Sequence, residues 1–240
     1  MVVDALQLPR NWQPFELPEV GTTLQERRAH VGAAWQRIRT TGLLDGDHVD
    51  IDVAGVFRAW VKPDVCVIVR AQQQDGQHHL LYRVTSTRGT GVFSQLIDDR
   101  IRFDEIGRQD PIREITNELP PVPPVPGLQE ITVNRGNTSN EVAAEDFDPL
   151  ARSAPAGTAA ADHREMRKFA QWPPVRVCSY ELAVDSGNNL NRLGAAQVID
   201  TEGGRYLILP DGDQRIRIVP SDGSHLRDWL HHQVDLAMNP

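Results

Sequence analysis

Cysteine is scarce in this sequence of 240 residues, which contains only Cys66 and Cys178. A small secreted protein held together by disulfides would need more cysteine pairs, so that class is excluded. Long apolar runs are also missing: the longest are a few residues, as at 65–69, too short to span a membrane. The first ten residues lack the basic and apolar regions of a signal peptide. We therefore expect a cytoplasmic protein without membrane contact, with both cysteines reduced and buried.

Basic charge is in short supply as well. The chain has 25 lysines and arginines against 33 acidic residues, which gives a net charge of −8. A protein that binds nucleic-acid phosphates needs a basic surface, so we expect no nucleic-acid partner. The hydrophobic content of 40% is ordinary for a globular protein and higher than a disordered chain would show.

The sequence also lacks the motifs of common catalytic chemistry. It has no nucleophile elbow, no P-loop and no dinucleotide-binding glycine motif. The pairs His78-His79 and His231-His232 are adjacent, which makes their side chains diverge, and neither has a cysteine or carboxylate at ligand spacing. The segment 45–50 resembles a calcium loop but has the wrong residues at positions six and twelve. We expect no catalytic residue, no metal ion and no cofactor.

The periodicity predicts helices and strands in an order that occurs twice. Thr23 and Glu26 form a capping box before a helix at 24–40, and Asp50 caps a helix at 51–60. Strands follow at 65–69, 79–87, 92–97 and 100–106, and then a helix after Asp110-Pro111. The second series has short helices at 141–150 and 162–171, strands at 175–184, 192–200, 206–209 and 215–219, and a closing helix at 224–236.

Equivalent features of the two series are separated by a nearly constant number of residues. Cys66 and Cys178 are 112 residues apart, and the segments 100–102 and 215–217, both Arg-Ile-Arg, are 115 apart. A constant separation with small drifts is typical of a duplicated unit. We predict an α+β fold of two similar halves about a pseudo-two-fold axis, each a four-stranded antiparallel meander with flanking helices.

The predicted halves are residues 1–119 and 139–240, packed as one integrated domain. Between them, residues 120–138 form a proline-rich connection, and the proline run at 120–126 is predicted to be a stiff spacer. The same run could alternatively be a ligand for an aromatic groove. The alanine-rich stretch 151–161 has small side chains and few anchors, which predicts mobility.

Several segments of the chain resemble the EspG family, the cytosolic chaperones of type VII (ESX) secretion. They include Gly42-Leu43-Leu44-Asp45, Val61-Lys62-Pro63-Asp64, residues 80–84 and 169–174, and the run from Gln197 through Asp200-Thr201 to Gly204-Arg205-Tyr206. The resemblance extends over about residues 20–235. Members of this family usually begin with a β-strand, which only residues 1–8 could supply here.

The resemblance implies binding without catalysis. The partner would be a PPE-type protein, paired with PE, whose apolar helical tip is held by the central sheet and the C-terminal helices. The loop implied to adjust partner choice lies between the first two strands and comprises Gln72, Gln73, Gln74, Asp75, Gly76, Gln77, His78 and His79. The alternative from the residues alone is a small-molecule-binding or hydrolytic α+β protein with a pocket between sheet and helices.

Overall fold

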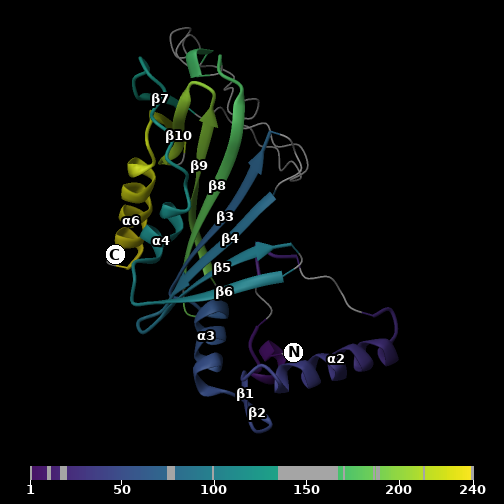
Figure 1. Ribbon diagram of the computed structural model, residues 1–240. Coiled ribbons are helices and arrows are strands. Elements are labelled where there is room, and N and C mark those ends of the chain that lie inside the picture. Colours follow the sequence, from purple (N-terminus) through teal and green to yellow (C-terminus); the bar gives the residue numbers. More distant parts are fainter. Residues whose placement is uncertain are drawn as a thin grey trace. The chain divides into compact units, whose positions relative to one another are not determined.

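The protein is described here from a computed structural model (Figure 1). The structure describes residues 2–9, 12–16, 21–74, 79–98, 100–134, 167–169, 171–185, 187, 190–212 and 214–238. The helix expected at 141–150 and the alanine-rich stretch 151–161 lie outside the described residues, as does most of the helix expected at 162–171. The fold is α+β, as the sequence predicts, with a large antiparallel sheet and few helices.

The larger sheet contains nine strands in the order β6-β5-β4-β3-β8-β9-β10-β11-β7. Each of the two predicted meanders contributes four strands in consecutive positions. The strands are β3 (Val65–Gln73), β4 (His79–Ser86), β5 (Gly91–Ile97), β6 (Arg100–Gly107), β7 (Ile131–Asn134), β8 (Pro174–Asp185), β9 (Leu190–Thr201), β10 (Gly204–Asp211) and β11 (Arg215–Pro220). The helices are α1 (Val2–Ala5), α2 (Leu24–Arg39), α3 (Ile51–Val61), α4 (Pro111–Asn117) and α6 (Ser224–Met238).

Local sequence signals explain where the helices begin. Thr23 accepts a hydrogen bond from the Glu26 backbone while the Glu26 carboxylate accepts one from the Thr23 backbone, which is the predicted capping box of α2. The Asp50 carboxylate accepts from the backbone N–H groups of Asp52 and Val53 at the start of α3. Between these helices, the segment that resembles a calcium loop in sequence forms most of a small hairpin of β1 (Leu44–Asp45) and β2 (His48–Val49).

The chain divides into two compact units, each built from separate segments. Unit 1 comprises Met1–Ile68, Leu81–Ile115 and Ala183–Asn191. Trp60 is at the centre of one of its cores, stacked on Phe15 with ring centroids 6.3 Å apart and edge-on to Phe103 at 5.0 Å. Its indole Nε1 donates to the Ser94 hydroxyl at 2.9 Å. The Arg83 guanidinium lies 5.0 Å from the Trp60 ring, and burial lowers the pKa of Arg83.

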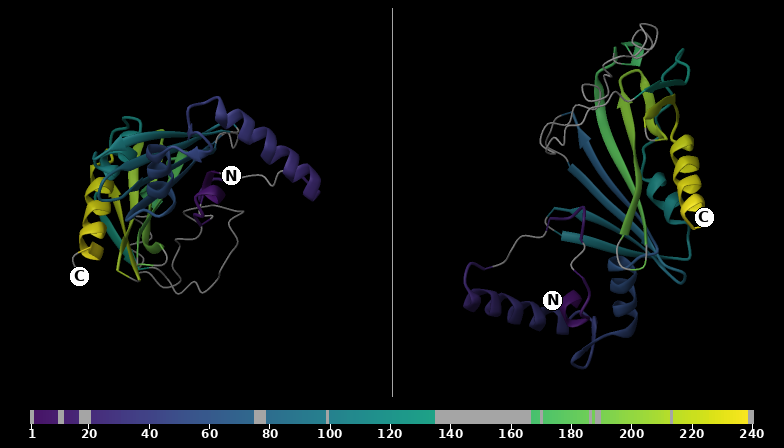
Figure 2. Two further views of the ribbon diagram at one scale, coloured as in Figure 1. Left: turned by 90° about the horizontal axis from the view of Figure 1, so that it is seen from below. Right: turned by 180° about the vertical axis from the view of Figure 1, so that it is seen from behind.

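Unit 2 comprises Val69–Leu80, Thr116–Leu182 and Arg192–Pro240. Its sheet has an apolar cluster on one face, made of residues Val125, Val133, Phe169, Ile199, Tyr206, Ile208, Ile216 and Ile218. Helix α6 packs against β10 and runs along one side of these strands (Figure 2). Its Leu226, Trp229 and Leu230, which are three and four residues apart, are buried, whereas Val234 is half-buried.

Three local features of the structure were not predicted from the sequence. Residues 2–5 form the short helix α1, so the β-strand usual at the start of the family is not formed by the described residues there. The proline run is more than a spacer, because Val125 donates its N–H to the Arg205 carbonyl at 3.1 Å and Arg205 donates to Pro123 at 2.7 Å. Strand β7 was not predicted at all; its four residues pair with β11. An edge strand this short has too few alternating residues to give a periodic signal.

Candidate interaction surface

One face of the unit 2 sheet is only partly covered at strands β8 and β9. Val177 packs against the apolar cluster, so Ser179 and Glu181, which follow at alternate positions on β8, point to the same side. On β9, Gln197 pairs with Ile208 in register and lies on that side too. We call this surface the open face; its members, none of them buried, are Arg70, Gln72, Val175, Val177, Ser179, Glu181, Leu193, Ala195 and Gln197.

An ion pair links the two strands that carry the most polar part of the open face. Arg70 of β3 donates to the Glu181 carboxylate of β8 at 2.6 Å. The two side chains are 39% and 26% exposed, which leaves the pair accessible to a partner. At this exposure an ion pair adds little to stability. Its charges are instead available to orient whatever docks on the apolar and small side chains beside it.

The opposite side of the same strands is closed. Cys178, Tyr180 and Leu182 alternate with the residues of the open face along β8 and are all at most 3% exposed. Burial raises the pKa of the Cys178 thiol to about 12. A thiol with this pKa is protonated at neutral pH and is a poor nucleophile. Neither cysteine is in a disulfide and both are buried, as the sequence predicts.

A buried charge cluster supports the closed side. Asp200 at the end of β9 accepts from the Arg205 guanidinium at 2.6 and 3.2 Å and also pairs with Arg176. Arg205 is fully buried and donates further to the carbonyl oxygens of Asp222 and Pro120 at 3.0 and 2.9 Å. Each Arg205 nitrogen is thereby satisfied, so the cluster holds the sheet, the proline run and the start of α6 together. Its role is structural.

The structure places part of the predicted loop in the sheet. Gln72 and Gln73 belong to β3, and the alternation from Arg70 puts Gln72 on the open face. Gln74 follows in a turn and donates its backbone N–H to the Val175 carbonyl at 3.1 Å. His79 begins β4. Asp75, Gly76, Gln77 and His78 lie outside the described residues. The structure thus brings Gln72 together with the open face and does not describe the middle of the loop.

Sequence reasoning missed the remaining members of the open face. The signal was present in β8, where Ser179 and Glu181 alternate with buried residues. This alternation could not identify the surface from the sequence. It shows that one face of the strand is polar, but it does not show where in the sheet the strand lies.

The described residues contain no cluster of histidine, cysteine and carboxylate side chains that could hold a metal ion. A groove of about 730 Å³ beside the β5–β6 turn is lined by Ile97, Asp98, Arg100, Ile101 and Arg102. Those side chains include no nucleophile paired with a base.

Among the helices that the structure describes, none is long and apolar enough to cross a membrane.

Comparisons with known proteins bear on the fold and on the family of the chain. The fold is similar to that of a solved structure of the Mycobacterium tuberculosis type VII secretion system chaperone EspG5 in complex with a PE25-PPE41 dimer. The TM-score is 0.63 at 13% sequence identity, over 98% of this chain and 92% of the other. No curated protein sequence matches the chain. A model of the EspG family matches residues 1–232. The chain therefore belongs to the EspG family, to which its sequence motifs point.

Proposed function

We propose that this chain is a chaperone of type VII secretion that binds the apolar helical tip of a PPE-type protein, paired with PE, and keeps it soluble for export. The observation that carries the proposal is the match to the EspG family over nearly the whole chain. The likeness of its fold to a chaperone solved with a PE–PPE dimer supports it. An exposed apolar tip aggregates unless it is covered, and a sheet face with adjoining helices can cover it.

The open face has the composition that such a reversible contact needs. Val175, Val177 and Leu193 offer apolar area, and the small Ser179 and Ala195 leave room for the side chains of a docking helix. Charged and amide groups at the margin keep the unoccupied chaperone soluble and orient the cargo. A contact that forms and dissociates during delivery should be of ordinary size, roughly 1,200–2,000 Å².

Two further segments complete the proposed contact. Helix α6 has Leu236 and Met238 exposed near its end, at 58% and 52%, which gives the C-terminal helix an apolar end for the cargo. The 72–79 loop would adjust which cargo fits, because it continues from the open face at Gln72. The protein would work without catalysis, a metal ion or a cofactor, in the cytoplasm, and would bind neither nucleic acid nor membrane.

The test is a binding measurement with PE–PPE pairs encoded in the same genome. We expect the wild-type chain to bind at least one pair, and binding to persist in moderate salt because the cargo tip is apolar. Ser179→Arg places a long charged side chain on the open face and should abolish binding, whereas the matched control Ser179→Ala adds nothing to the surface and should bind normally. Both variants should melt close to the wild type. Failure of every pair, with turnover of a small substrate instead, would favour the enzyme alternative.

We also propose that the two halves, residues 1–119 and 139–240 with a connection at 120–138, are related by a pseudo-two-fold axis. The consecutive strands β3–β6 and β8–β11, together with the near-constant sequence separation, support this. An experimental structure in which the two halves superpose strand for strand would establish it. Halves with unrelated helix positions would refute it.

A further inference from the structure

Helix α2 has an apolar stripe that is only partly covered in the part of the chain that the structure describes, with Trp35 and Ile38 half-buried. None of its sixteen residues is buried, and Leu24 and Val31 are 75% and 43% exposed. Leu24, Val31 and Ile38 are seven residues apart, with Trp35 beside them on the same side of the helix. A surface helix normally turns such a stripe toward a core. The exposed part of the stripe, at Leu24 and Val31, is therefore available to a partner.

Local hydrogen bonds contribute to the stability of the helix, because none of its residues is buried. At its start, the capping box satisfies two backbone N–H groups, and the hydrogen bonds from Thr22 and Thr23 lower the pKa of the Glu26 carboxyl. At its end, the hydroxyls of Thr40 and Thr41 donate to the Arg37 and Ile38 carbonyls at 2.8 and 2.7 Å. A helix of this length is marginal in water without packing, so caps at both ends favour its persistence before a partner arrives.

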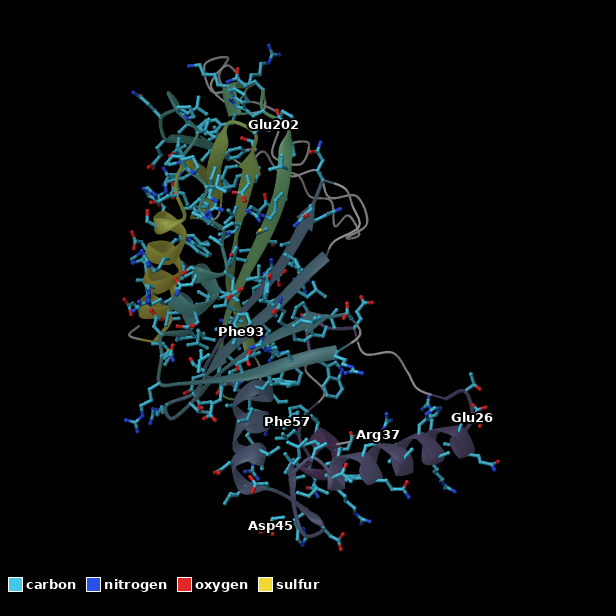
Figure 3. All side chains as sticks on the ribbon, viewed as in Figure 1. Glu26, Arg37, Asp45, Phe57, Phe93 and Glu202 are labelled. Atoms are coloured by element: carbon cyan, nitrogen blue, oxygen red, sulfur yellow. The ribbon has the colours of Figure 1, made fainter. Side chains whose placement is uncertain are left out.

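The charge of α2 is opposite to that of the rest of the protein. It carries four arginines and one glutamate, a net charge of +3 with His30 neutral, in a chain of net charge −8. By the 100° turn per residue, Arg27 and Arg28 border the stripe on its two sides. Figure 3 shows Glu26 at one end of α2 and Arg37 farther along the helix. The occupant should therefore place carboxylates on both sides of an apolar strip.

We propose that α2 is a second cargo-binding element, which packs lengthwise along an acidic-flanked helix of the PE–PPE pair; this inference rests on the proposed function. Apolar residues spaced seven apart lie on one side of a helix. That side can pack along a neighbouring helix over its whole length, as in a coiled coil. A second copy of α2 is a poorer occupant. Two copies would bring together six net positive charges, and two helices of sixteen residues bury less than the roughly 1,200 Å² of a stable interface.

The experiment compares two substitutions that add the same negative charge to α2. Val31→Glu changes the centre of the stripe, and Ala33→Glu changes the opposite side of the helix. Calorimetric titration with the PE–PPE pair that binds the wild type should show about a tenfold loss of affinity for Val31→Glu, because a valine buried by the cargo is replaced by a repelled carboxylate. Ala33→Glu should remain within about twofold of the wild type. Circular dichroism of both variants should match the wild type.

The outcomes separate this inference from the proposed function. If the wild type binds a PE–PPE pair and both variants bind equally well, the inference about α2 is wrong and the proposed function stands. If the wild type binds none, both are overturned. A concentration-dependent dimer in sedimentation that Val31→Glu abolishes, with cargo affinity unchanged, would assign the stripe to a second copy. Retention of the wild type on phosphatidylglycerol vesicles, lost in Val31→Glu with cargo affinity unchanged, would assign it to a lipid surface.

Discussion

Removing the charge of Asp200 tests whether the buried cluster holds unit 2 together. In Asp200→Asn the side chain keeps its shape but loses its negative charge. The amide also has only one acceptor oxygen, in place of the two carboxylate oxygens that accept from Arg176 and Arg205. Water cannot compensate Arg205 for this loss, because its side chain is 0% exposed and cannot be solvated in place. Its remaining hydrogen bonds, to the carbonyls of Asp222 and Pro120, do not neutralise the charge.

The expected effect follows from this burial. Removing one partner of a buried ion pair lowers the free energy of unfolding by about 3–5 kcal/mol, since an uncompensated charge is left inside. For a chain of this length that corresponds to a fall in melting temperature of about 6–20 °C. The matched control is Asp47→Asn, which removes an ion pair to Arg39 whose side chains are 82% and 60% exposed. A pair at this exposure contributes at most about 1 kcal/mol.

Urea unfolding is the assay, with the midpoint and the slope fitted separately for the wild type and both variants. A change in midpoint at constant slope reports stability alone. We expect Asp200→Asn to shift the midpoint several times further than Asp47→Asn. If the two variants unfold at the same urea concentration, then water or structural relaxation screens Arg205, and the interpretation of the cluster as a structural anchor is wrong.

Three further predictions concern single residues. Cys66 and Cys178 should react with a thiol reagent only after unfolding, because burial holds the pKa of Cys178 at about 12; fast labelling of the native protein would contradict this. Gly204→Ala should melt well below Gly89→Ala, since Gly204 has φ +131° and an added Cβ would lie 2.8 Å from a carbonyl oxygen, whereas Gly89 has open space; equal melting points would be the contrary result. A hydrogen bond from the Ser224 backbone lowers the pKa of the Asp222 carboxyl, so its contribution to stability is present above its ordinary pKa and is lost as the pH falls. Asp222→Ala should therefore unfold at lower urea than the wild type at pH 7 and at the same urea at about pH 2, and a difference that does not change with pH would refute the assignment.

Local signals in the sequence were enough to predict the starts of α2, α3, α4 and α6 and both series of strands. Thr23, Glu26 and Asp50 act on backbone groups two to three residues away, so their roles can be read without a tertiary structure. Strand β8 alternates buried and half-buried residues, whereas β3, β5 and β10 contain short runs of buried residues, and both patterns indicate strands. The family could likewise be named from short segments along the chain, because motifs are properties of the sequence alone.

The tertiary structure alone decided which surfaces are covered. The stripe of α2 and the stripe of α6 have the same kind of periodicity, yet α6 is buried at Leu226 and Leu230 and α2 is buried nowhere. Arg205 meets the Pro120 carbonyl across 85 residues of sequence, and Arg70 meets Glu181 across 111. Periodicity records how a segment alternates along itself and contains no information about which distant segment packs against it. The buried charge cluster, the open face and the partly exposed α2 stripe all depend on that pairing.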